Sequence, residues 1–365
     1  MILTNGFDPD PRVYKEAKSL VKMGHEVIIL CWDREGKYKD KEIEIVDGIV
    51  IQRFFSNAEY GSGYKQIFKY KVFINEVIDY LNNNKFDAVH CHDFDTLYMG
   101  YKVKKANNIK LVYDEHDLFY MYFKNRKGFL NKFIAFVIRN MEKRLLKKVD
   151  THILVTEEML NLYKDISSNT CIINNAPTED TFNNIEKTYS DKLRIGYIGS
   201  IRYVDKLKAL IDVCKKYEKE VDVIISGRGI DLEELKEYTS SVSNVKLTGG
   251  YTMDELESLY QNIDITYAFY PGEISSISMP NKFYESIITE TPIIANEFME
   301  FGKVVKKNNI GFCMNEDNLF KELDITIKDI LDNKQRLQDA INNMRKIKRD
   351  YLWEANEKVL KEIYS

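Results

Sequence analysis

Residues 1–32 read "MILTNGFDPDPRVYKEAKSLVKMGHEVIILCW" and contain a short apolar run, a helical segment and a second apolar run. The helical segment, "DPRVYKEAKSLVKMG", has apolar residues at helical spacing and ends on a glycine. A strand followed by a helix and another strand favours a parallel sheet. This stretch therefore predicts an α/β fold.

The same alternation of short apolar runs and helical segments continues along the chain. It predicts two parallel sheets, each covered by helices on both faces. The polar stretch 174–192 separates the two halves and is the expected linker, and 365 residues are too many for one ordinary core. The other expected strands are "GIVIQRFF", "FDAVHCH", "IKLVYDEH", "THILVT" and "TCIINNA" in the first half, and "KLRIGYIGS", "VDVIISGRG", "NVKLTGG", "IDITYAFY" and "TPIIANE" in the second.

The composition excludes several classes of protein. A formal net charge of −4 gives no case for nucleic-acid binding. The cysteines are scattered without CxxC or zinc spacing, which favours reduced thiols in a cytoplasmic protein. The apolar run "FIAFVI" is too short to span a bilayer, and "MILTN" leads into the first strand with no secretion signal expected.

Two loops that follow strands in the second half are candidates for ligand binding, because open parallel sheets bind ligands at the carboxyl ends of their strands. In "GSIRYVDK", Gly199 lets the backbone approach a ligand, and Arg202 and Lys206 can neutralise a diphosphate. Ser200 lies within the same loop. The alternative is a glycine turn with two surface cations.

The second loop, "SGRG", contributes Gly227, Arg228 and Gly229 and lacks the GxGxxG spacing of a dinucleotide fold. It fits a tight turn beside a flat ligand such as a nucleobase, and it fits an ordinary strand–helix turn equally well.

The stretch "SMPNKFYES", residues 278–286, predicts the start of a helix that holds an anion. Pro280 suits the first turn, and Asn281 and Lys282 follow while the backbone N–H groups are unpaired. Glu285 comes one turn later on the same face and can accept hydrogen bonds from ribose hydroxyls. The alternative is a solvent-facing glutamate on an amphipathic helix.

Residues 119–148 are expected to form a basic, aromatic-rich amphipathic helix with nine Lys or Arg and a single acid, Glu142. Such a helix can lie on an anionic membrane, or it can pack its apolar side onto the first sheet. The basic and aromatic stretch 60–73 favours a membrane or a lipid-linked acceptor. The expected apolar stripe comprises Leu130, Phe133, Ile134, Val137, Met141 and Leu145.

In this order and spacing, the motifs resemble the family-four glycosyltransferases, which have the GT-B architecture of two Rossmann-like domains with parallel sheets facing a central cleft. The resemblance covers nearly the whole chain. It rests on "FDPDPRVYKEAKSLVKMGHEV", "FDAVHCHD", "LVYDEHD", "GYIGSIRYVDKL", "PNKFYESIITETPIIA" and "YLWEANEKVLKEIY".

The resemblance implies a retaining transferase of the hexosyltransferase type, with the leaving diphosphate assisting the acceptor. It places His116 of "YDEHD" beside the donor sugar, and the alternative is a structural histidine at a strand end. Asp93 of "HCHDFD" either orients an acceptor hydroxyl or caps a helix. The family's two glutamates stand eight positions apart, but the first position here is Ile277 and Glu273 is out of register.

Metal ions are not expected to take part. The "DPD" at 8–10 and the "DFD" at 93–95 mimic the DxD of metal-dependent transferases, but neither lies in the half that holds the diphosphate. Strand alternation points His90 and His92 one way and Cys91 the other, which does not make a zinc site. Lysine and a helix start are expected to carry the charge instead.

The sequence thus predicts an acceptor-side domain over 1–180, a nucleotide-sugar-binding domain over 190–345 and a helix over 346–365 that crosses back to the first domain. The predicted protein is cytoplasmic, peripheral on the inner membrane face through 119–148, and needs no cofactor. Its predicted substrates are a nucleotide-diphosphate sugar and a saccharide or lipid-linked saccharide, in cell-surface polysaccharide or glycolipid synthesis. The alternatives are a sugar-nucleotide epimerase of the same fold and a catalytically silent partner subunit.

Overall fold

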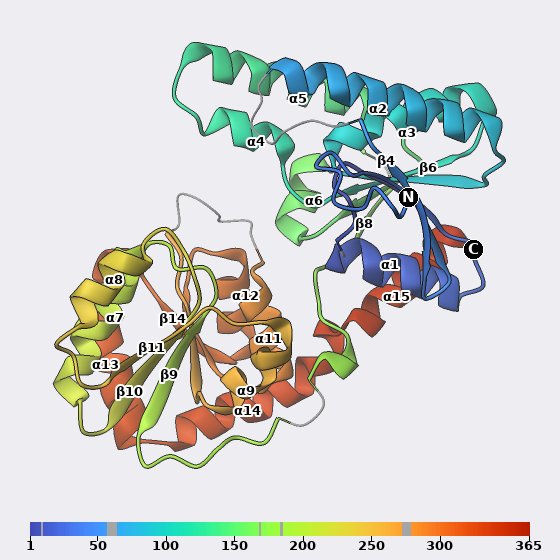
Figure 1. Ribbon diagram of the computed structural model, residues 1–365. Helices are drawn as coiled ribbons and strands as arrows, with labels where there is room; N and C mark the ends of the chain where they lie inside the picture. Colours follow the sequence, from blue (N-terminus) through green and yellow to red (C-terminus); the bar gives the residue numbers. More distant parts are fainter. Residues whose placement is uncertain (9, 57–63, 168, 183–184, 272–278) are drawn as a thin grey trace. The chain divides into compact units, whose positions relative to one another are not determined.

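The computed structural model divides the chain into two α/β units (Figure 1). It describes residues 1–8, 10–56, 64–167, 169–182, 185–271 and 279–365. Residues 1–174 and 356–365 form the first unit, and residues 175–355 form the second. The expected boundaries were 180 and 346. The chain therefore changes unit at the start of the polar stretch 174–192 and returns ten residues later than expected.

The first unit contains an eight-stranded sheet in the order β3-β4-β2-β1-β5-β6-β7-β8. Every pairing is parallel except that of β3 with β4. The strands are β1 (Ile2–Leu3), β2 (Ile28–Trp32), β3 (Ile43–Val46), β4 (Ile49–Phe54), β5 (Ala88–His92), β6 (Lys110–Glu115), β7 (Thr151–Leu154) and β8 (Thr170–Ile172). The helices are α1 (Pro11–Lys22), α2 (Tyr64–Asn83), α3 (Phe94–Asn107), α4 (Phe119–Lys124), α5 (Phe129–Leu146) and α6 (Glu157–Tyr163).

The second unit contains a six-stranded parallel sheet in the order β11-β10-β9-β12-β13-β14. Its strands are β9 (Leu193–Ile198), β10 (Val221–Ser226), β11 (Val245–Gly249), β12 (Ile265–Ala268), β13 (Ile293–Asn296) and β14 (Gly311–Met314). Its helices are α7 (Val204–Cys214), α8 (Leu232–Thr239), α9 (Leu256–Gln261), α11 (Asn281–Ile288), α12 (Glu300–Asn308), α13 (Leu319–Asp332) and α14 (Gln335–Ile347). The last helix, α15 (Trp353–Tyr364), belongs to the first unit from Asn356 onward.

In each sheet, successive strands are added first on one side of a central strand and then on its other side. In the first sheet β1 pairs with both β2 and β5, and in the second sheet β9 pairs with both β10 and β12. Ligands of doubly wound sheets bind beside such switch points, outside the carboxyl ends of the strands. The loops after β5, β6, β9 and β10 are therefore candidate ligand-binding loops.

Three features differ from the sequence-based expectation. Strands β3 and β14 were not expected; β3 is a short antiparallel edge strand, and β14 is a four-residue parallel strand at the other sheet's edge. The expected helix over 119–148 is two helices, because Gly128 adopts a φ of 108° directly before α5. Among the described residues, no helix is both long and apolar enough to cross a bilayer.

Candidate functional site

The two glycine loops of the second unit pack directly on each other. The Gly199 N–H donates to Ser226 O at 2.9 Å, and the Ile201 N–H donates to Arg228 O at 2.8 Å. A Cβ on Gly227 would lie 1.8 Å from Gly199 O, and a Cβ on Gly229 would lie 2.0 Å from Ile201 O. Loop-to-loop contact therefore explains both glycines of "SGRG", which favours the ordinary-turn interpretation over a nucleobase platform.

The polar side chains of these loops face solvent. Ser200 and Arg202 are exposed, and the Arg202 Nε donates to Ser200 Oγ at 3.2 Å. Arg228 is also exposed and lies across Gly250, where an added Cβ would come within 2.1 Å of its Nε. Both guanidinium groups are thus accessible at the carboxyl ends of β9 and β10.

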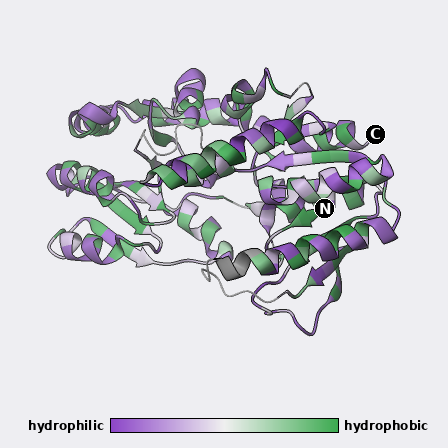
Figure 2. Ribbon diagram, turned by 90° about the horizontal axis from the view of Figure 1, so that it is seen from above, coloured by the Kyte–Doolittle hydropathy of each residue, from purple (hydrophilic) through white to green (hydrophobic). Residues whose placement is uncertain are grey.

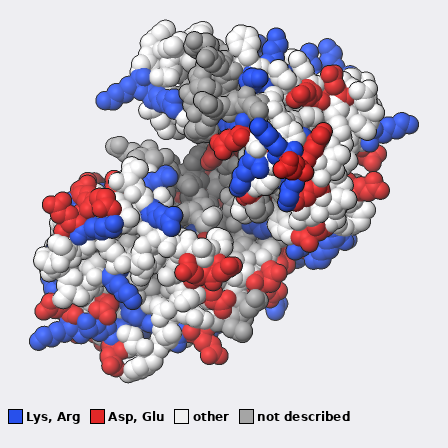
Figure 3. All heavy atoms as spheres, in the orientation of Figure 1, with Lys and Arg blue, Asp and Glu red and all other residues white. Residues whose placement is uncertain are grey.

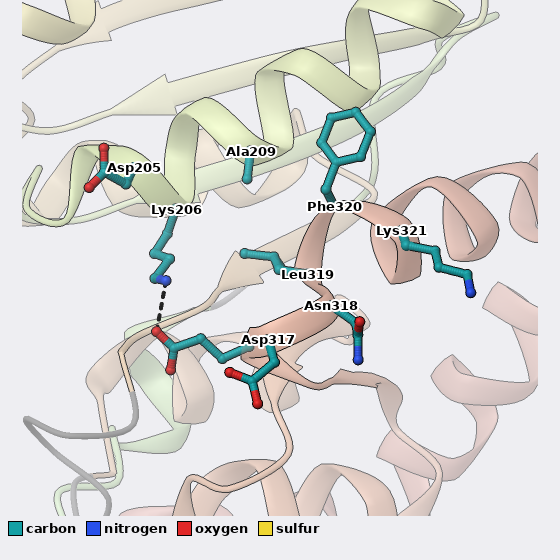
Figure 4. A pocket seen from close by; sticks show the side chains of 9 residues that line it. Asp205, Lys206, Ala209, Asp317, Asn318, Leu319, Phe320 and Lys321 are labelled. Carbon is teal, nitrogen blue, oxygen red and sulfur yellow. Dashed lines mark ion pairs between the residues drawn. The ribbon is translucent and has the colours of Figure 1, made fainter.

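Lys206 lies on the first turns of α7 and lines a hollow of about 380 Å³ (Figure 4). Its Nζ points across the hollow to the Glu316 carboxylate, which accepts at 2.7 Å. Asp205 and Asp317 line the same hollow, so its surface is richer in acids than in cations. The lysine that the sequence assigns to a diphosphate is therefore paired with a carboxylate of its own unit.

Lys282 has a different environment. Helix α11 begins at Asn281, so Pro280 is the residue before the helix rather than its first residue, and Asn281 is exposed. The Lys282 side chain is only 6% exposed, and its Nζ lies 3.7 Å from the centre of the Tyr197 ring. Burial lowers the pKa of Lys282 to about 7. Among the described residues, no carboxylate forms an ion pair with this Nζ.

The Lys282 Nζ also lies against the backbone of the β9–α7 loop. A Cβ built on Gly199, whose φ is 145°, would come within 3.1 Å of Nζ. A side chain at position 199 would therefore press against the lysine, and it would also be strained at this positive φ. The loop glycine and the helix-start lysine, predicted separately, are neighbours in the structure.

Glu285 lies one turn after Lys282 and is partly exposed. Its Oε2 accepts from the Tyr260 hydroxyl at 2.9 Å, and burial raises the pKa of its carboxyl group. The next residue, Ser286, donates to Thr266 Oγ1 at 2.7 Å and thereby ties α11 to β12. The positions of Glu273 and Ile277 lie outside the described residues.

In the first unit, Asp93 follows β5 with φ 62° and ψ 164°, a backbone conformation that non-glycine residues rarely adopt. It stands before α3 but its side chain makes no cap hydrogen bond, which corrects the helix-cap alternative. Instead, its Oδ1 accepts from the His116 N–H at 3.1 Å, and its own N–H donates to Asp114 O at 2.9 Å. Asp93 thus positions His116.

His116 belongs to a buried chain of charges. Its Nε2 lies 2.6 Å from Asp114 Oδ2, and Arg12 donates to both Asp114 oxygens at 2.7 and 2.8 Å. Burial alone would lower the pKa of His116, but the Asp114 charge outweighs it and raises the pKa to about 9. The imidazolium, 18% exposed, is therefore a fixed positive charge at the end of β6.

A group of potential metal ligands lies directly behind His116. Glu16, His90, His92 and Asp114, all buried, each place one ligand atom within 4.8 Å of the others, and no second such group occurs among the described residues. Strand alternation does bring His90 and His92 together, with rings stacked at 4.4 Å. Arg12, however, lies 3.2 Å from Glu16 and bonds Asp114, so the cluster already contains a cation.

The absence of a metal ion from the reaction therefore remains a prediction.

Sequence reasoning missed Arg12 and Glu16, although their i,i+4 spacing on α1 is a signal that the sequence contains. It also missed Tyr364 of α15, whose hydroxyl lies 2.8 Å from His90 Nδ1.

The two DxD sequences have other partners. Asp8 pairs with Lys37 and Tyr38, and Asp10 caps α1 by accepting from the Arg12 and Val13 N–H groups. Asp95 accepts from Thr4 Oγ1 at 2.5 Å. These contacts explain the aspartates as structural, although Pro9 between the first two lies outside the described residues.

Comparisons with known proteins match both halves of the chain to glycosyltransferase families. Residues 12–176 match the model of Glycosyltransferase Family 4, and residues 192–333 match that of Glycosyl transferases group 1. The chain belongs to the family-four-like glycosyltransferases. A curated relative, an uncharacterised glycosyltransferase of Methanocaldococcus jannaschii (MJ1069), is 22% identical over 280 residues, which are 70% of this chain and 68% of the relative.

Solved glycosyltransferase structures share the fold of this transferase. Sucrose-phosphate synthase from Thermosynechococcus elongatus is 15% identical with a TM-score of 0.77, covering 100% of this chain and 97% of that chain. HepE of Anabaena in complex with UDP-glucose is 13% identical with a TM-score of 0.68, covering 99% and 97%. The predicted α/β fold with two parallel-sheet domains of GT-B type is confirmed.

Proposed function

We propose that this transferase moves a sugar from a nucleotide-diphosphate sugar to a hydroxyl of a saccharide or lipid-linked saccharide. The observation that carries the proposal is Lys282, a buried lysine beside Gly199 that forms no ion pair with a carboxylate among the described residues, although the charge of Glu285 acts on it. A diphosphate at Nζ would supply the direct ionic partner that this lysine lacks. The solved HepE complex, which contains UDP-glucose, supports the class of donor.

The remaining assignments follow from position. Arg202 and Arg228 are exposed at the strand ends and can reach phosphate oxygens, while Glu285 on α11 accepts hydrogen bonds from the ribose. Lys206 joins them if the diphosphate replaces the Glu316 carboxylate as its partner. The leaving diphosphate gains negative charge in the transition state, so fixed cations around it lower the barrier.

His116 completes the proposal. Its imidazolium, held by Asp93 and Asp114, provides a positive charge for an oxygen of the transferred sugar. We expect transfer with retention of configuration, on a hexose, in the synthesis of a cell-surface polysaccharide or glycolipid at the cytoplasmic side of the membrane. These finer points rest on the family resemblance.

The test combines a binding assay with a transfer assay. Thermal-shift measurements with nucleotides and nucleotide-diphosphate sugars identify the donor, and the protein is then incubated with radiolabelled donor and acceptor saccharides. We expect a shift with one nucleotide and label in the acceptor. A free altered sugar nucleotide, formed without acceptor, would identify an epimerase instead. The absence of any nucleotide shift would identify a silent partner subunit.

Two variants separate the roles. If Lys206 contacts the diphosphate, Lys206→Ala is expected to remove about 2–4 kcal/mol of transition-state stabilisation and so to slow turnover. His116→Asn is expected to lower kcat while nucleotide affinity stays unchanged, because Lys282 and Glu285 belong to the other unit. Unchanged kcat in His116→Asn would make it a structural histidine.

A further inference from the structure

Helix α5 of the first unit presents large apolar side chains to solvent. Phe129 is 85% exposed and Phe136 67% exposed, values typical of charged surface residues rather than of phenylalanine. The exposed apolar residues of this helix are Phe129, Leu130, Phe133, Phe136, Val137 and Met141. A set of this size on one helix exceeds the scattered apolar residues of an ordinary surface.

These side chains lie on one face, since residues three, four and seven positions apart meet on the same side of a helix. The opposite face packs on the protein through Ala135, Glu142 and Leu146, the buried residues of α5. The predicted stripe containing Leu130 and Met141 is therefore turned outward. This corrects the alternative in which that stripe packs onto the first sheet. We call the six exposed side chains the α5 ridge. Figure 2 looks down on the side of the first unit that carries α5.

The segment that carries the α5 ridge is positively charged. Residues 119–148 contain nine Lys or Arg, and their single acid, Glu142, is completely buried. Its carboxylate accepts from the Tyr113 and Tyr163 hydroxyls, both at 3.0 Å. The exposed charged side chains of this segment are thus all cationic. They are Lys124, Arg126, Lys127, Lys132, Arg144, Lys147 and Lys148. Figure 3 shows Lys and Arg, together with Asp and Glu, on one face of the first unit.

We propose that the α5 ridge inserts into an anionic lipid bilayer, with the surrounding lysines and arginines on the headgroups. The inference goes beyond the transfer reaction and does not depend on it. A bilayer has an apolar layer beneath an anionic surface. The segment has apolar side chains for the first and cationic side chains for the second. The proposal describes a shallow, peripheral contact in which α5 lies along the surface.

Other occupants match only half of the surface. A second copy of the chain, paired through the same face, would cover the apolar side chains but bring one set of cations against another, with no exposed acid in residues 119–148 to pair with them. A polyanion such as RNA would match the cations but would leave three phenylalanines and a leucine without an apolar partner. The combination of both features selects the bilayer.

Vesicle flotation at low salt tests the proposal. The full chain is mixed with phosphatidylcholine vesicles that contain roughly one quarter phosphatidylglycerol, and with phosphatidylcholine alone. We expect binding to the anionic vesicles only, weakened by added salt. Phe129→Ser with Phe136→Ser should lower the affinity at least about tenfold. Because both side chains are exposed, the melting temperature of this variant should stay unchanged.

The first unit also contains a matched control. Ile43 and Ile45 of the edge strand β3 are exposed apolar residues outside residues 119–148. Ile43→Ser with Ile45→Ser removes apolar surface in the same way and should leave vesicle binding unchanged. An equal loss in this control would mean that any apolar surface contributes, which would overturn the assignment to α5.

A tryptophan placed on the ridge reports insertion directly. The chain has two tryptophans, Trp32 and Trp353, and both are buried. In Phe133→Trp, the new side chain should shift its emission to the blue on adding anionic vesicles and be quenched by brominated acyl chains. Binding without a blue shift would reduce the contact to surface electrostatics and overturn insertion. Dimers in analytical ultracentrifugation that Phe129→Ser abolishes, or tight RNA binding without vesicle binding, would identify another occupant.

Discussion

Lys282 provides the sharpest test of the donor site, because burial has moved its pKa into the range of ordinary buffers. Its Nζ lies 3.7 Å from the Tyr197 ring centre and 5.2 Å from that of Tyr270, and burial lowers its pKa to about 7. Without ligand, about half of the molecules therefore carry a neutral Lys282 at pH 7. A diphosphate bound at Nζ would favour the charged form and draw a proton from the buffer.

The expected size of this uptake follows from the pKa. If the bound diphosphate returns the pKa of Lys282 to its ordinary range, binding takes up about 0.1 proton at pH 6, about 0.5 at pH 7 and about 0.9 at pH 8. The same reasoning gives the direction in which affinity changes with pH. Because the complex holds more protons than the free protein, affinity falls as pH rises, by about tenfold between pH 6 and pH 8.

Isothermal titration calorimetry measures this uptake. A nucleotide-diphosphate sugar is titrated at pH 7 in two buffers of different ionisation enthalpy, and the difference in binding heat gives the number of protons. A nucleotide sugar is preferred to a free nucleoside diphosphate, whose terminal phosphate titrates near this pH. In Lys282→Met the uptake should vanish. In Lys206→Met, which removes a cation paired with Glu316, affinity falls but the uptake should persist.

Two results would refute the reasoning. Binding without proton uptake in the wild-type protein would mean that the phosphates do not charge Lys282. Equal uptake in the wild-type protein and in Lys282→Met would assign the proton to another group. In either case the buried lysine would be a structural residue of α11, and the phosphate site would have to be sought at the exposed arginines Arg202 and Arg228.

Four further predictions concern other residues. Glu285→Gln should weaken nucleotide binding about ten- to a hundredfold, and less for a 2′,3′-dideoxy nucleotide in the same titration; an equal loss for both would make Glu285 a support for Tyr260. Activity should survive EDTA, and loss that Mn²⁺ restores would point to Glu16, His90, His92 and Asp114. Gly227→Ala should cost at least about 3 kcal/mol in urea unfolding, but Gly249→Ala, also at positive φ with open space around it, only about 1–2 kcal/mol. Burial raises the pKa of Glu142 to about 8, so stability should fall as pH rises from the unfolded-state value towards 8. Glu142→Gln should flatten that fall, and an unchanged pH profile would assign it elsewhere.

The fold was predictable because the same sequence pattern, a short apolar run followed by a helical segment, is repeated along the chain. Every run expected to be a strand contains one, since a buried parallel strand is a short apolar run between turn signals. Strand β3, which escaped prediction, lacks that pattern. In β3, Ile43 and Ile45 alternate with Glu44, and both isoleucines face solvent on an edge, so their apolar character does not report a core. The break at Gly128 escaped for a related reason, because helical spacing continues on both sides of it.

The candidate site was predictable in its parts but not in its pairings. Sequence order places His116 at a strand end, but the fixed charge of His116 depends on Asp114 and Arg12, and Arg12 lies far away in the sequence. The backbone of Asp93 is another example. A left-handed aspartate carries no sequence signal, yet its conformation lets its carboxylate accept from the His116 N–H. Such features arise from long-range contacts, which spacing within a motif does not encode.

Lys206 and Lys282 of the second unit show that the sequence indicates where a cation lies but not how strongly it binds a ligand. Spacing makes Lys206 and Lys282 equivalent, as cations near a strand end or a helix start. The fold gives Lys206 a carboxylate at 2.7 Å and leaves Lys282 beside an aromatic ring and a loop glycine. A ligand must displace Glu316 to use Lys206, whereas at Lys282 it restores the solvation that burial removed. We therefore expect the larger share of diphosphate affinity to come from Lys282, although it is the less exposed of the two.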